Sequence, residues 1–342
     1  MNHLRDALAT MALGRELTRQ SLESAFEDLL HPDTPPVLIA SFLTALRLQG
    51  ETATVLESAV GAVLNHALPF ASADELGPVR LDTCGTGGDG AASINISTAS
   101  AFVAAAAGVP VVKHGNRSAT GRSGSSDVLE ALGIRTDLPV DTLCQIYADL
   151  KFVFLFAPAF HPALKNLAPI RKQLPFRTVF NLVGPLASPA RPTHQLLGVA
   201  DHALAGLFAQ VLQKSGVVRA AVISAQDGLD EVSTGAPTRA LLVTPDATEE
   251  LLWHPELTFG IAMHDIGGLR VESAEESARR IRAVFEGRAE RPVDEVAILM
   301  NAAAGIWLAG FADSPMAGMD LARSVVKSGA VMDLLNRYRK FC

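Results

Sequence analysis

The first 68 residues carry apolar side chains at the spacing of helices. Apolar residues recur every three or four positions, at Leu4, Leu8, Met11, Leu22, Phe26 and Leu29. This period places them on one face of a helix, where they can pack together. After the prolines at 32, 35 and 36, residues 37–48 start a further helix. The pattern predicts a small all-helical unit without a strand.

From Pro78 the pattern changes to short apolar runs that end in glycine-rich loops, each followed by a longer run rich in Ala and Leu. Such alternation predicts strands that alternate with helices. The expected strands are residues 79–84, 109–113, 152–156, 196–199 and 217–224, and the expected helices include 97–107 and 127–132. We therefore expect an α/β fold with a mainly parallel central sheet, beside the small all-helical domain.

The longest apolar stretch, residues 296–312, does not predict a membrane span. It has 17 residues, fewer than the ~20 that a span needs, and it contains Asn301. We expect a buried helix that is capped near Asp294. The first twenty residues carry charges and only a short apolar run, unlike a secretory signal. We expect a cytoplasmic protein without a membrane partner.

The charge balance favours a small ligand over a polymer. Lys and Arg number 29 and Asp and Glu 36, a net charge of -7, which disfavours nucleic acid and anionic membranes because both attract dense positive charge. Residues 108–191 nevertheless hold ten basic and five acidic side chains, an excess that suits a small anionic ligand. Cys84, Cys144 and Cys342 are too widely spaced for a disulfide framework or a zinc site.

The segment LDTCGTGGDGAASINISTAS, residues 81–100, is the strongest sign of chemistry. A predicted strand runs into Gly85, Gly87, Gly88 and Gly90 and then into hydroxyl and amide side chains. Glycines let backbone N–H groups approach an anion, and the start of the next helix offers further donors. The segment predicts a phosphate cradle; a tight turn with a helix cap is the alternative. Neither a Walker A nor a GxGxxG pattern fits it.

The loop KHGNRSATGRSGSS, residues 113–126, follows the next predicted strand. Because parallel strands end at the same edge of a sheet, we expect this loop beside the first one. Its Lys, His, Asn and Arg side chains add positive charge and hydrogen-bond donors there. Two polar loops are thus predicted to face one ligand.

The segment DGLDEVS, residues 227–233, holds two adjacent carboxylates after the predicted strand 217–224. Neighbouring side chains of a strand point to opposite faces, but in a turn both can reach one cation. Magnesium commonly uses one or two carboxylates together with substrate phosphates. Asp230 and Glu231 are therefore candidate Mg2+ ligands, although a surface turn is the more frequent explanation for such a pair alone.

Taken together, these segments resemble the anthranilate phosphoribosyltransferase family. The similar stretches follow the family's order along nearly the whole chain: GTGGDG at 85–90, NIST at 95–98, KHGNRS at 113–118, SGSSDVLEALG at 123–133, APIRKQL at 168–174, RTVFNLVGPL at 177–186, QLLGV at 195–199 and GLDEVS at 228–233. Such an ordered series is far more specific than a single glycine-rich loop.

The resemblance implies an enzyme of two domains. Residues 1–68 with about 162–176 would form the small helical domain, and 69–161 with 177–342 the α/β domain that binds phosphoribosyl pyrophosphate. The active site would lie in the cleft between them, and the chain would form a homodimer through helical parts. The implied reaction converts phosphoribosyl pyrophosphate and anthranilate into phosphoribosylanthranilate and pyrophosphate, a step of tryptophan biosynthesis, with Mg2+ as the only cofactor.

Carried over motif by motif, the resemblance assigns three sets of residues. The phosphoribosyl set is Gly85, Gly88, Asp89, Ser93, Asn95, Ile96, Ser97, Thr98, Lys113, Gly115, Asn116, Arg117, Ser118 and Ser125. The anthranilate set is Gly85, His114, Asn116, His161, Arg171 and Gly184, and the metal set is Ser97, Asp230 and Glu231. A planar guanidinium such as that of Arg171 suits the carboxylate of anthranilate, because it can form paired hydrogen bonds.

Some positions depart from the family's usual residues. Thr120 and Gly121 stand where many members carry serines, and Ser126 where Ala is usual. A Pro-Phe pair at 175 and 176 replaces the common Gly-Ile pair. These changes leave the details of the loops open.

The implied chemistry needs no protein nucleophile. Pyrophosphate leaves the anomeric carbon as the aromatic amine attacks, and the protein holds the two substrates in line. The chain has no Ser-His-Asp or Cys-His signature, and we expect Cys84 to be a packed thiol. We assign no general base, because the amine of anthranilate is neutral near pH 7.

Three alternatives stay open at this point. A pyrimidine nucleoside phosphorylase of the same fold would use phosphate and a nucleoside, and a related phosphoribosyltransferase would use another aromatic acid. A non-catalytic relative would bind nucleic acid. The GTGGDG and NIST segments favour pyrophosphate, and the net charge of -7 disfavours nucleic acid.

Overall fold

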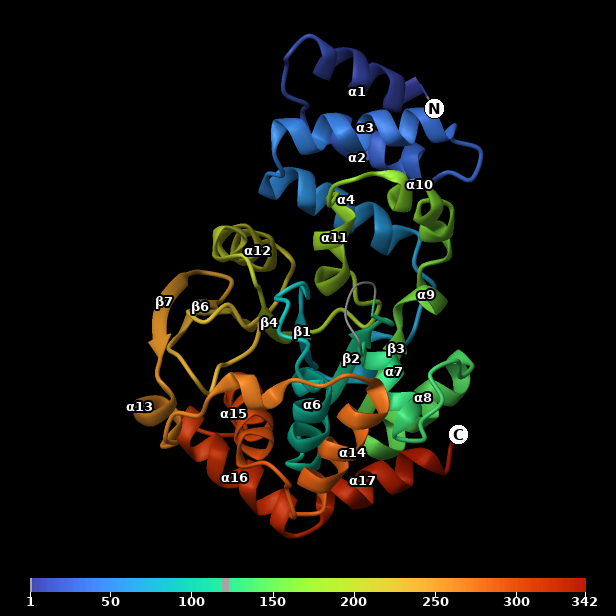
Figure 1. Cartoon of the computed structure of the whole chain (residues 1–342). Coiled ribbons are helices and arrows are strands. Elements are labelled where there is room, and N and C mark those ends of the chain that lie inside the picture. The colour runs from blue at the N-terminus through green and yellow to red at the C-terminus, as the bar shows by residue number, and fades with distance from the viewer. Residues whose placement is uncertain (1, 119–122) are drawn as a thin grey trace. The chain divides into compact units, whose positions relative to one another are not determined.

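The computed structural model describes residues 2–118 and 123–342 and divides the chain into two compact units (Figure 1). The helical unit comprises Met1–Pro69 and Ala157–Pro189, and the α/β unit comprises Phe70–Phe156 and Ala190–Cys342. The second helical segment is thus longer than the expected 162–176. It occupies nearly the whole connection between two strands of the α/β unit that are consecutive in the sequence, Phe152–Phe156 and His194–Gly198.

The helical unit is built from amphipathic helices, as the apolar spacing predicts. Its elements are α1 (Asn2–Ala12), α2 (Arg19–Leu30), α3 (Pro36–Gln49), α4 (Ala53–Asn65), α9 (Ala157–Phe160), η1 (Pro162–Asn166), α10 (Ala168–Gln173), α11 (Phe180–Val183) and η2 (Gly184–Leu186). Thr18 caps α2, because its hydroxyl accepts a hydrogen bond from the N–H of Ser21. Phe26 packs edge-on against Phe42 and Phe180, with ring centroids 5.5 and 6.2 Å away.

The α/β unit contains a seven-stranded sheet with the strand order β3-β2-β1-β4-β5-β6-β7. The strands are β1 (Leu81–Gly85), β2 (Val111–Gly115), β3 (Phe152–Phe156), β4 (His194–Gly198), β5 (Arg219–Ala225), β6 (Thr238–Val243) and β7 (Thr248–Trp253). The first five strands pair in parallel, and β6 and β7 add an antiparallel edge. The expected α/β fold with a mainly parallel sheet is confirmed.

Two details of the sheet differ from the sequence prediction. β2 extends to Gly115, so His114 is a strand residue rather than the first residue of a loop. β6 and β7 are not among the predicted strands. β7 exposes most of its side chains at the sheet edge, and such a strand lacks the continuous apolar run that marks a buried one.

Ten α-helices and two 3-10 helices complete the described part of the α/β unit. They are α5 (Ala73–Leu76), α6 (Ile96–Ala106), α7 (Ser125–Ala131), α8 (Val140–Leu150), η3 (His202–Leu204), α12 (Ala205–Lys214), α13 (Pro255–Phe259), η4 (Ile266–Leu269), α14 (Ala274–Phe285), α15 (Pro292–Leu308), α16 (Pro315–Lys327) and α17 (Ala330–Arg339). The helix α6 packs on β1 and β2, and α15 packs on α6 and β4. These two helices therefore support the strands that end at the predicted site.

The helix α15 is the buried helix that the long apolar stretch predicts. It begins earlier than expected, at Pro292, and Arg291 occupies its cap position without a side-chain cap. Asp294 lies in the first turn, where its carboxylate pairs with Arg280 instead of capping the helix. Within residues 2–118 and 123–342, no helix is long and apolar enough to cross a membrane.

Candidate functional site

The ends of β1 and β4 lie directly against the loop that carries the two adjacent carboxylates. A Cβ atom added to Gly198 would stand 1.6 Å from the backbone oxygen of Asp230. A Cβ atom added to Gly85 would stand 2.5 Å from the Oδ2 atom of Asp230. Glycine is therefore required at both strand ends, because any side chain would displace this loop. The segments around 85 and 230, far apart in sequence, meet at one edge of the sheet.

Asp230 and Glu231 accept hydrogen bonds from the glycine-rich segment. The N–H of Gly87 donates to Oδ2 of Asp230 at 2.8 Å, and the N–H of Ser97 donates to Oε1 of Glu231 at 3.1 Å. Because Ser97 lies in the first turn of α6, the positive end of that helix stabilises the carboxylate of Glu231. Part of the donor capacity expected to bind a phosphate is thus already used by a carboxylate.

These carboxylates form a concentration of negative charge. Burial, together with the negative charge of the nearby Asp89, raises the pKa of Asp230 to about 7. The pKa of Glu231 lies well above its ordinary value because of burial and the neighbouring Asp230, while Lys113 partly opposes this shift. Groups that repel one another in this way favour a bound cation.

The metal set fits a cation that shares its ligands with a substrate. Within residues 2–118 and 123–342, no three or more His, Cys, Asp and Glu side chains are grouped so that they could hold a metal ion by themselves. Two carboxylates and a hydroxyl are the incomplete set of hard oxygen ligands that magnesium uses when phosphate oxygens supply the rest. Asp230, Glu231 and Ser97 therefore suit Mg2+ better than a metal that needs a complete protein cage.

Lys113 of β2 lies in the interior beside the metal set. Its side chain is 2% exposed, and its ammonium donates to the backbone oxygen of Thr83 and, at 3.3 Å, to Oγ of Ser97. Burial lowers the pKa of Lys113, whereas Asp82 and Glu231 oppose this effect. The ammonium is thus held by groups of β1 and α6 at the carboxyl edge of the sheet.

Asp82 is a buried acid that the sequence analysis misses. It is 0% exposed on β1, and its Oδ1 accepts the N–H of His114 at 3.3 Å. Burial raises its pKa to about 7, and Lys113 opposes the rise. The sequence offers one signal for the pairing of Asp82 with Lys113: an acid within a predicted strand, next to a glycine-rich loop.

The glycines of the first loop adopt left-handed backbone conformations. Gly87, Gly88 and Gly90 have φ angles of 66°, 84° and 72°, a left-handed region that L side chains rarely adopt. Asp89 turns back on this loop and accepts the N–H of Ala91 at 3.1 Å. Because these glycines carry no side chains, a ligand can approach the backbone of the loop at these positions.

The residues that follow this loop have different surroundings. Asn95 precedes α6 but makes no side-chain cap; its amide bonds Ser123 and Ser277 instead. Ile96 is 1% exposed and belongs to the core. The hydroxyl oxygen of Thr98 is buried and meets no hydrogen-bond partner among the described residues. Of these residues, Ser97 contacts Glu231 of the metal set through its backbone N–H.

The second loop is closed by Asp127. Oδ2 of Asp127 accepts the N–H groups of Ser118 at 3.1 Å and Gly124 at 2.9 Å. Arg117 pairs with Asp127 and with Glu130, at 3.1 and 2.5 Å, so its guanidinium already has two acidic partners. Of the phosphoribosyl set, Gly115 ends β2, Asn116 follows it and Ser125 begins α7, where its hydroxyl donates to the backbone oxygen of Asn116 at 3.3 Å. The departures at positions 120 and 121 lie outside the described residues.

The anthranilate set is divided between the two units. Gly85, His114 and Asn116 belong to the α/β unit, whereas His161, Arg171 and Gly184 belong to the helical unit. All of the phosphoribosyl set and all of the metal set belong to the α/β unit. The structure therefore brings the phosphate-side residues together on one sheet edge and leaves the anthranilate set on two units.

Arg171 is the least satisfied cation of the predicted sets. Its Nε atom is buried and meets no hydrogen-bond partner within the described part of the chain. The guanidinium stacks over Phe180 at 5.8 Å from the ring centroid, and burial lowers its pKa. Such a group gains most from a carboxylate, because the charge and the free donor are satisfied together.

His161 of the helical unit is buried and close to neutral. It is 5% exposed, and burial lowers its pKa, an effect that hydrogen bonds with the backbone of Ala187 and Val63 oppose. Its contacts within the helical unit are those of a packing residue. Gly184, the third member of the anthranilate set in the helical unit, begins η2.

Asn301 is a further polar residue that the sequence analysis notes only as an interruption of an apolar helix. It is 0% exposed, and its Oδ1 accepts the N–H of Val232 at 2.8 Å. Its Nδ2 donates to the oxygens of Val232 and Ala297 at 3.0 and 2.9 Å. The side chain thus binds the N–H and the C=O of Val232, the residue directly after Glu231. It fixes the end of the loop 227–233 that carries the two carboxylates, here called the metal loop.

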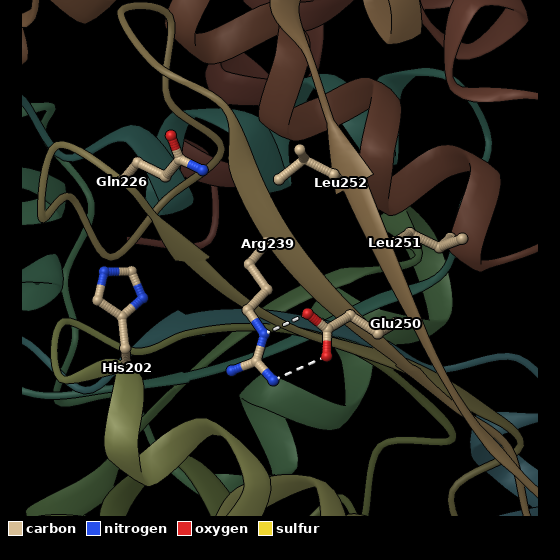
Figure 2. Close-up of a pocket in the computed structure, with 6 residues that line it drawn as sticks. All are labelled: His202, Gln226, Arg239, Glu250, Leu251 and Leu252. Atoms are coloured by element: carbon tan, nitrogen blue, oxygen red, sulfur yellow. Dashed lines mark hydrogen bonds and ion pairs between the residues drawn. The ribbon is translucent and has the colours of Figure 1, made fainter.

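A separate cavity of about 660 Å³ lies on the antiparallel side of the sheet (Figure 2). It is lined by His202, Gln226, Arg239, Glu250, Leu251 and Leu252. Arg239 and Glu250 face each other with paired contacts of 2.8 Å. No residue of the three predicted sets lines this cavity, and its two charges satisfy each other.

Family models match both parts of the chain. The model for the glycosyl transferase family helical bundle domain matches residues 5–67, and the model for the a/b domain of the same family matches residues 77–332. The anthranilate phosphoribosyltransferase of Thermomicrobium roseum is 43% identical over 97% of this chain and 95% of its own length. That of Rubrobacter xylanophilus is 40% identical over 98% and 96%.

Solved structures of the same enzyme are similar over nearly the full length. The enzyme of Thermus thermophilus has a TM-score of 0.91 and 36% identity, with 98% of this chain and 99% of that chain covered. The enzyme of Saccharomyces cerevisiae, in complex with PRPP and Mg, has a TM-score of 0.89 and 29% identity, with 99% and 97% covered. On sequence and on structure alike, the chain belongs to the anthranilate phosphoribosyltransferase family.

Proposed function

We propose that the three sets of residues described above carry out, in this chain, the reaction of its family. The chain is a glycosyltransferase that transfers the phosphoribosyl group from phosphoribosyl pyrophosphate to the amine of anthranilate, in tryptophan biosynthesis. The products are N-(5-phosphoribosyl)anthranilate and pyrophosphate. The main support for the residue roles is the meeting of the glycine-rich loop with Asp230 and Glu231 at the ends of β1 and β4.

The phosphoribosyl set would bind the phosphorylated sugar through backbone and side-chain donors. The left-handed glycines 88 and 90 leave backbone groups accessible to an anion, whereas the N–H of Gly87 already donates to Asp230. Lys113 supplies the positive charge closest to the metal set, because its ammonium already bonds Ser97. Arg117 contributes less, since Asp127 and Glu130 occupy its guanidinium. These donors would stabilise the negative charge that grows on pyrophosphate as the bond to the sugar breaks.

Asp230 and Glu231, with Ser97, would hold Mg2+. When bound, magnesium neutralises charge on the diphosphate and so makes it a better leaving group. The two carboxylates need a cation because burial and mutual repulsion make their charged forms costly. Asn301 keeps the loop in place by binding both backbone groups of Val232.

Arg171 would bind the carboxylate of anthranilate. Its buried Nε and its stacking on Phe180 hold the guanidinium ready for a planar acid. His161, whose contacts are those of a packing residue, would shape the same side. The protein then acts by orientation, which can contribute ~7 to 11 kcal/mol in favourable cases, rather than by a covalent step.

The assembly and location of the chain are part of the same proposal. We propose a cytoplasmic homodimer formed through helical parts, as the family resemblance implies. Leu13, Val37 and Leu48 of the helical unit are 68%, 68% and 83% exposed, and such apolar side chains suit an interface. Light scattering at several protein concentrations checks the dimer, and a monomer throughout would contradict it.

A fluorescence assay with anthranilate, phosphoribosyl pyrophosphate and Mg2+ tests the function directly. We expect turnover of anthranilate and little turnover of 3- or 4-aminobenzoate, because Arg171 is proposed to orient the acid relative to the amine. A parallel assay with a pyrimidine nucleoside and phosphate should give no product. Turnover of another aminobenzoate in preference to anthranilate, or phosphorolysis of the nucleoside, would contradict the proposal.

A further inference from the structure

Residues 92–94, in the middle of the proposed phosphoribosyl loop, are held by the segment 268–271. Ser93 and Arg270 form an antiparallel bridge. The N–H of Ile94 donates to the oxygen of Leu269 at 3.0 Å, and the N–H of Val271 donates to the oxygen of Ala92 at 2.9 Å. This isolated bridge ties the loop to a segment from a distant part of the sequence.

The need for such support is visible at Ala92. Its φ angle is 49°, in the left-handed region, where a non-glycine residue is disfavoured. The hydrogen bond from Val271 to its carbonyl retains this conformation. The loop therefore depends on outside contacts rather than on its own backbone preference.

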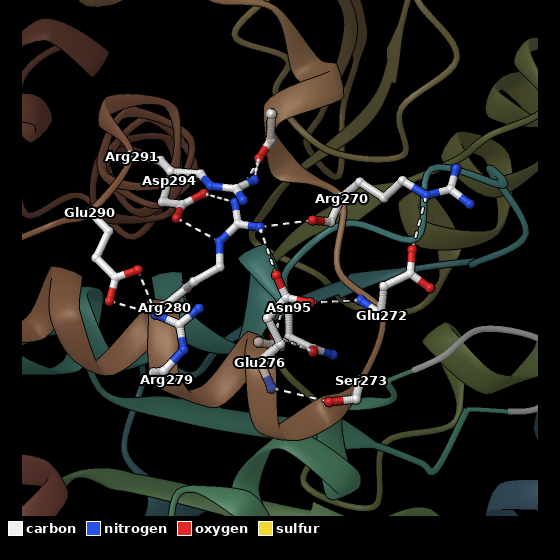
Figure 3. Close-up of polar contacts among 12 residues, drawn as sticks. Asn95, Arg270, Glu272, Ser273, Glu276, Arg279, Arg280, Glu290, Arg291 and Asp294 are labelled. Atoms are coloured by element: carbon white, nitrogen blue, oxygen red, sulfur yellow. Dashed lines mark hydrogen bonds and ion pairs between the residues drawn. The ribbon is translucent and has the colours of Figure 1, made fainter.

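Arg280 of α14 holds the other edge of the same segment. It is 1% exposed, and its guanidinium donates to the backbone oxygens of Gly268 and Arg270 at 2.7 and 2.8 Å. Its Nε donates to Oδ2 of Asp294 at 2.8 Å, with a second contact to the same carboxylate (Figure 3). The backbone oxygens of Gly268 and Arg270 thus accept hydrogen bonds from Arg280. The backbone oxygen of Leu269, between them, accepts the N–H of Ile94 in the loop.

Ser277, one turn before Arg280 on α14, reaches the loop directly. The N–H of Asn95 donates to its hydroxyl oxygen at 3.1 Å, and that hydroxyl donates to Oδ1 of Asn95 at 2.9 Å. The hydroxyl of Ser123 donates to the same Oδ1 at 2.7 Å. Asn95 is thereby fixed by both its backbone and its side chain, although it makes no helix cap.

We propose that Ser277 and Arg280 are positioning residues that hold loop 92–95 in the conformation that binds phosphoribosyl pyrophosphate. Neither residue belongs to the phosphoribosyl set, and each acts through another: Ser277 through Asn95, and Arg280 through the segment 268–271. The inference rests on the proposed function, because it assigns that loop to the phosphorylated sugar. A loop held in its binding conformation loses little entropy when the ligand arrives, so affinity rises.

The variant Ser277→Ala tests the proposal with the smallest change to the fold. We expect its KM and Kd for phosphoribosyl pyrophosphate to rise about five- to tenfold, the effect of one or two lost hydrogen bonds. The KM for anthranilate should stay within about twofold, because the other substrate does not contact this loop in the proposed site. The matched control is Ser58→Ala, a buried serine whose hydroxyl donates to the oxygen of Thr54.

The second variant is Arg280→Lys, which keeps the charge but replaces the planar fork. A single ammonium can pair with Asp294 but cannot serve both carbonyls at once, so the affinity for phosphoribosyl pyrophosphate should again fall about tenfold or more. Calorimetric titration with phosphoribosyl pyrophosphate and Mg2+ measures affinity, and thermal unfolding measures folding. A variant that melts early but binds normally once folded would show a purely structural role and overturn the proposal for Arg280.

The outcomes separate this inference from the proposed function. Wild-type protein that neither binds nor consumes phosphoribosyl pyrophosphate would overturn both. Active wild-type protein with a Ser277→Ala variant that behaves like Ser58→Ala would overturn the positioning role alone. Equal increases of both KM values in Ser277→Ala would also contradict it, because a loop specific to one substrate cannot affect both alike.

Discussion

The phosphate side and the acceptor side of the proposed site are built in opposite ways. In the α/β unit, Asp230, Glu231 and Lys113 are linked to backbone groups and to Ser97 by hydrogen bonds within the protein. In the helical unit, Arg171 keeps a buried Nε that no described residue satisfies. One side is an internally connected network, and the other contains a cation that is incomplete without a ligand.

This difference suggests a division of labour between the two units. A network that satisfies its own members is rigid and can orient a large anion with several phosphates. A single unsatisfied guanidinium contributes selectivity, because only a ligand with a carboxylate completes it. Substitution of the metal ligands Asp230 and Glu231 should therefore impair the whole reaction, whereas substitution of Arg171 should mainly impair the use of anthranilate.

The largest effect is expected from Asp230→Asn combined with Glu231→Gln. Neutral amides bind magnesium far more weakly than carboxylates, so activity at low Mg2+ should fall by about hundredfold or more and recover in part as Mg2+ increases. Initial rates over a wide range of Mg2+ concentrations check this. An unchanged magnesium requirement would count against the metal set.

A smaller and more selective effect is expected from Arg171→Ala. Loss of a charged hydrogen-bonded pair should raise the KM for anthranilate about 10- to 100-fold, and the KM for phosphoribosyl pyrophosphate much less. Steady-state kinetics with each substrate varied in turn measure the split. The charge-matched control is Arg239→Ala, at the separate cavity, which should leave both KM values nearly unchanged. Equal increases for both substrates would remove the role assigned to Arg171.

A moderate effect is expected from Asn301→Ala. The backbone groups of Val232 lose a buried partner, which should lower the free energy of unfolding by about 1 to 3 kcal/mol. The metal loop should also loosen, so the magnesium requirement should rise several-fold even in protein that is fully folded. Urea unfolding and magnesium titration provide the two measurements. Lower stability with an unchanged magnesium requirement would restrict Asn301 to a structural role.

The smallest effect concerns the pH dependence of stability at His161. Burial lowers its pKa in the folded protein below the ordinary value of 6.5, so the unfolded chain binds the proton more readily. The stability linked to the neutral ring is complete above pH 6.5 and is lost as the pH falls through the folded pKa. His194, whose pKa is also lowered by burial, acts in the same direction.

The variant His161→Asn isolates this contribution. We expect its free energy of unfolding to fall less between pH 7 and pH 5 than that of the wild type, because His194 is present in both proteins. Chemical denaturation at several pH values measures the difference. If the free energies of unfolding of the wild type and the variant changed in parallel with pH, the ring would not be buried as a neutral group.

The candidate site could be proposed from the sequence where its residues are neighbours in the chain. The glycines at 87, 88 and 90 and the pair Asp230–Glu231 can be read from short segments, because a loop conformation and a carboxylate pair are local properties. Asp82, Ser277 and Arg280 were not predicted. Each acts on a residue at least ten positions away, so no local spacing reveals the contact.

Some patterns were readable but pointed to different contacts. Asp294 precedes the long apolar stretch and suggests a helix cap, yet its carboxylate pairs with Arg280. Arg117 lies in a polar loop and suggests an anion site, yet two acids of the protein already bind it. In both cases a charged side chain has several suitable partners, and packing decides among them.

The order of apolar and polar residues was therefore enough to establish the two-part architecture, the parallel sheet and the loops that bear the chemistry. These features depend on periodicity and on the conformational freedom of glycine, which act over a few residues. The close approach of Gly85 and Gly198 to Asp230, the binding of Val232 by Asn301 and the support of loop 92–95 by α14 arose only when distant segments packed together. Buried polar groups need hydrogen-bond partners, and in these cases the partners come from distant segments. Their geometry is therefore fixed only when the whole chain has folded.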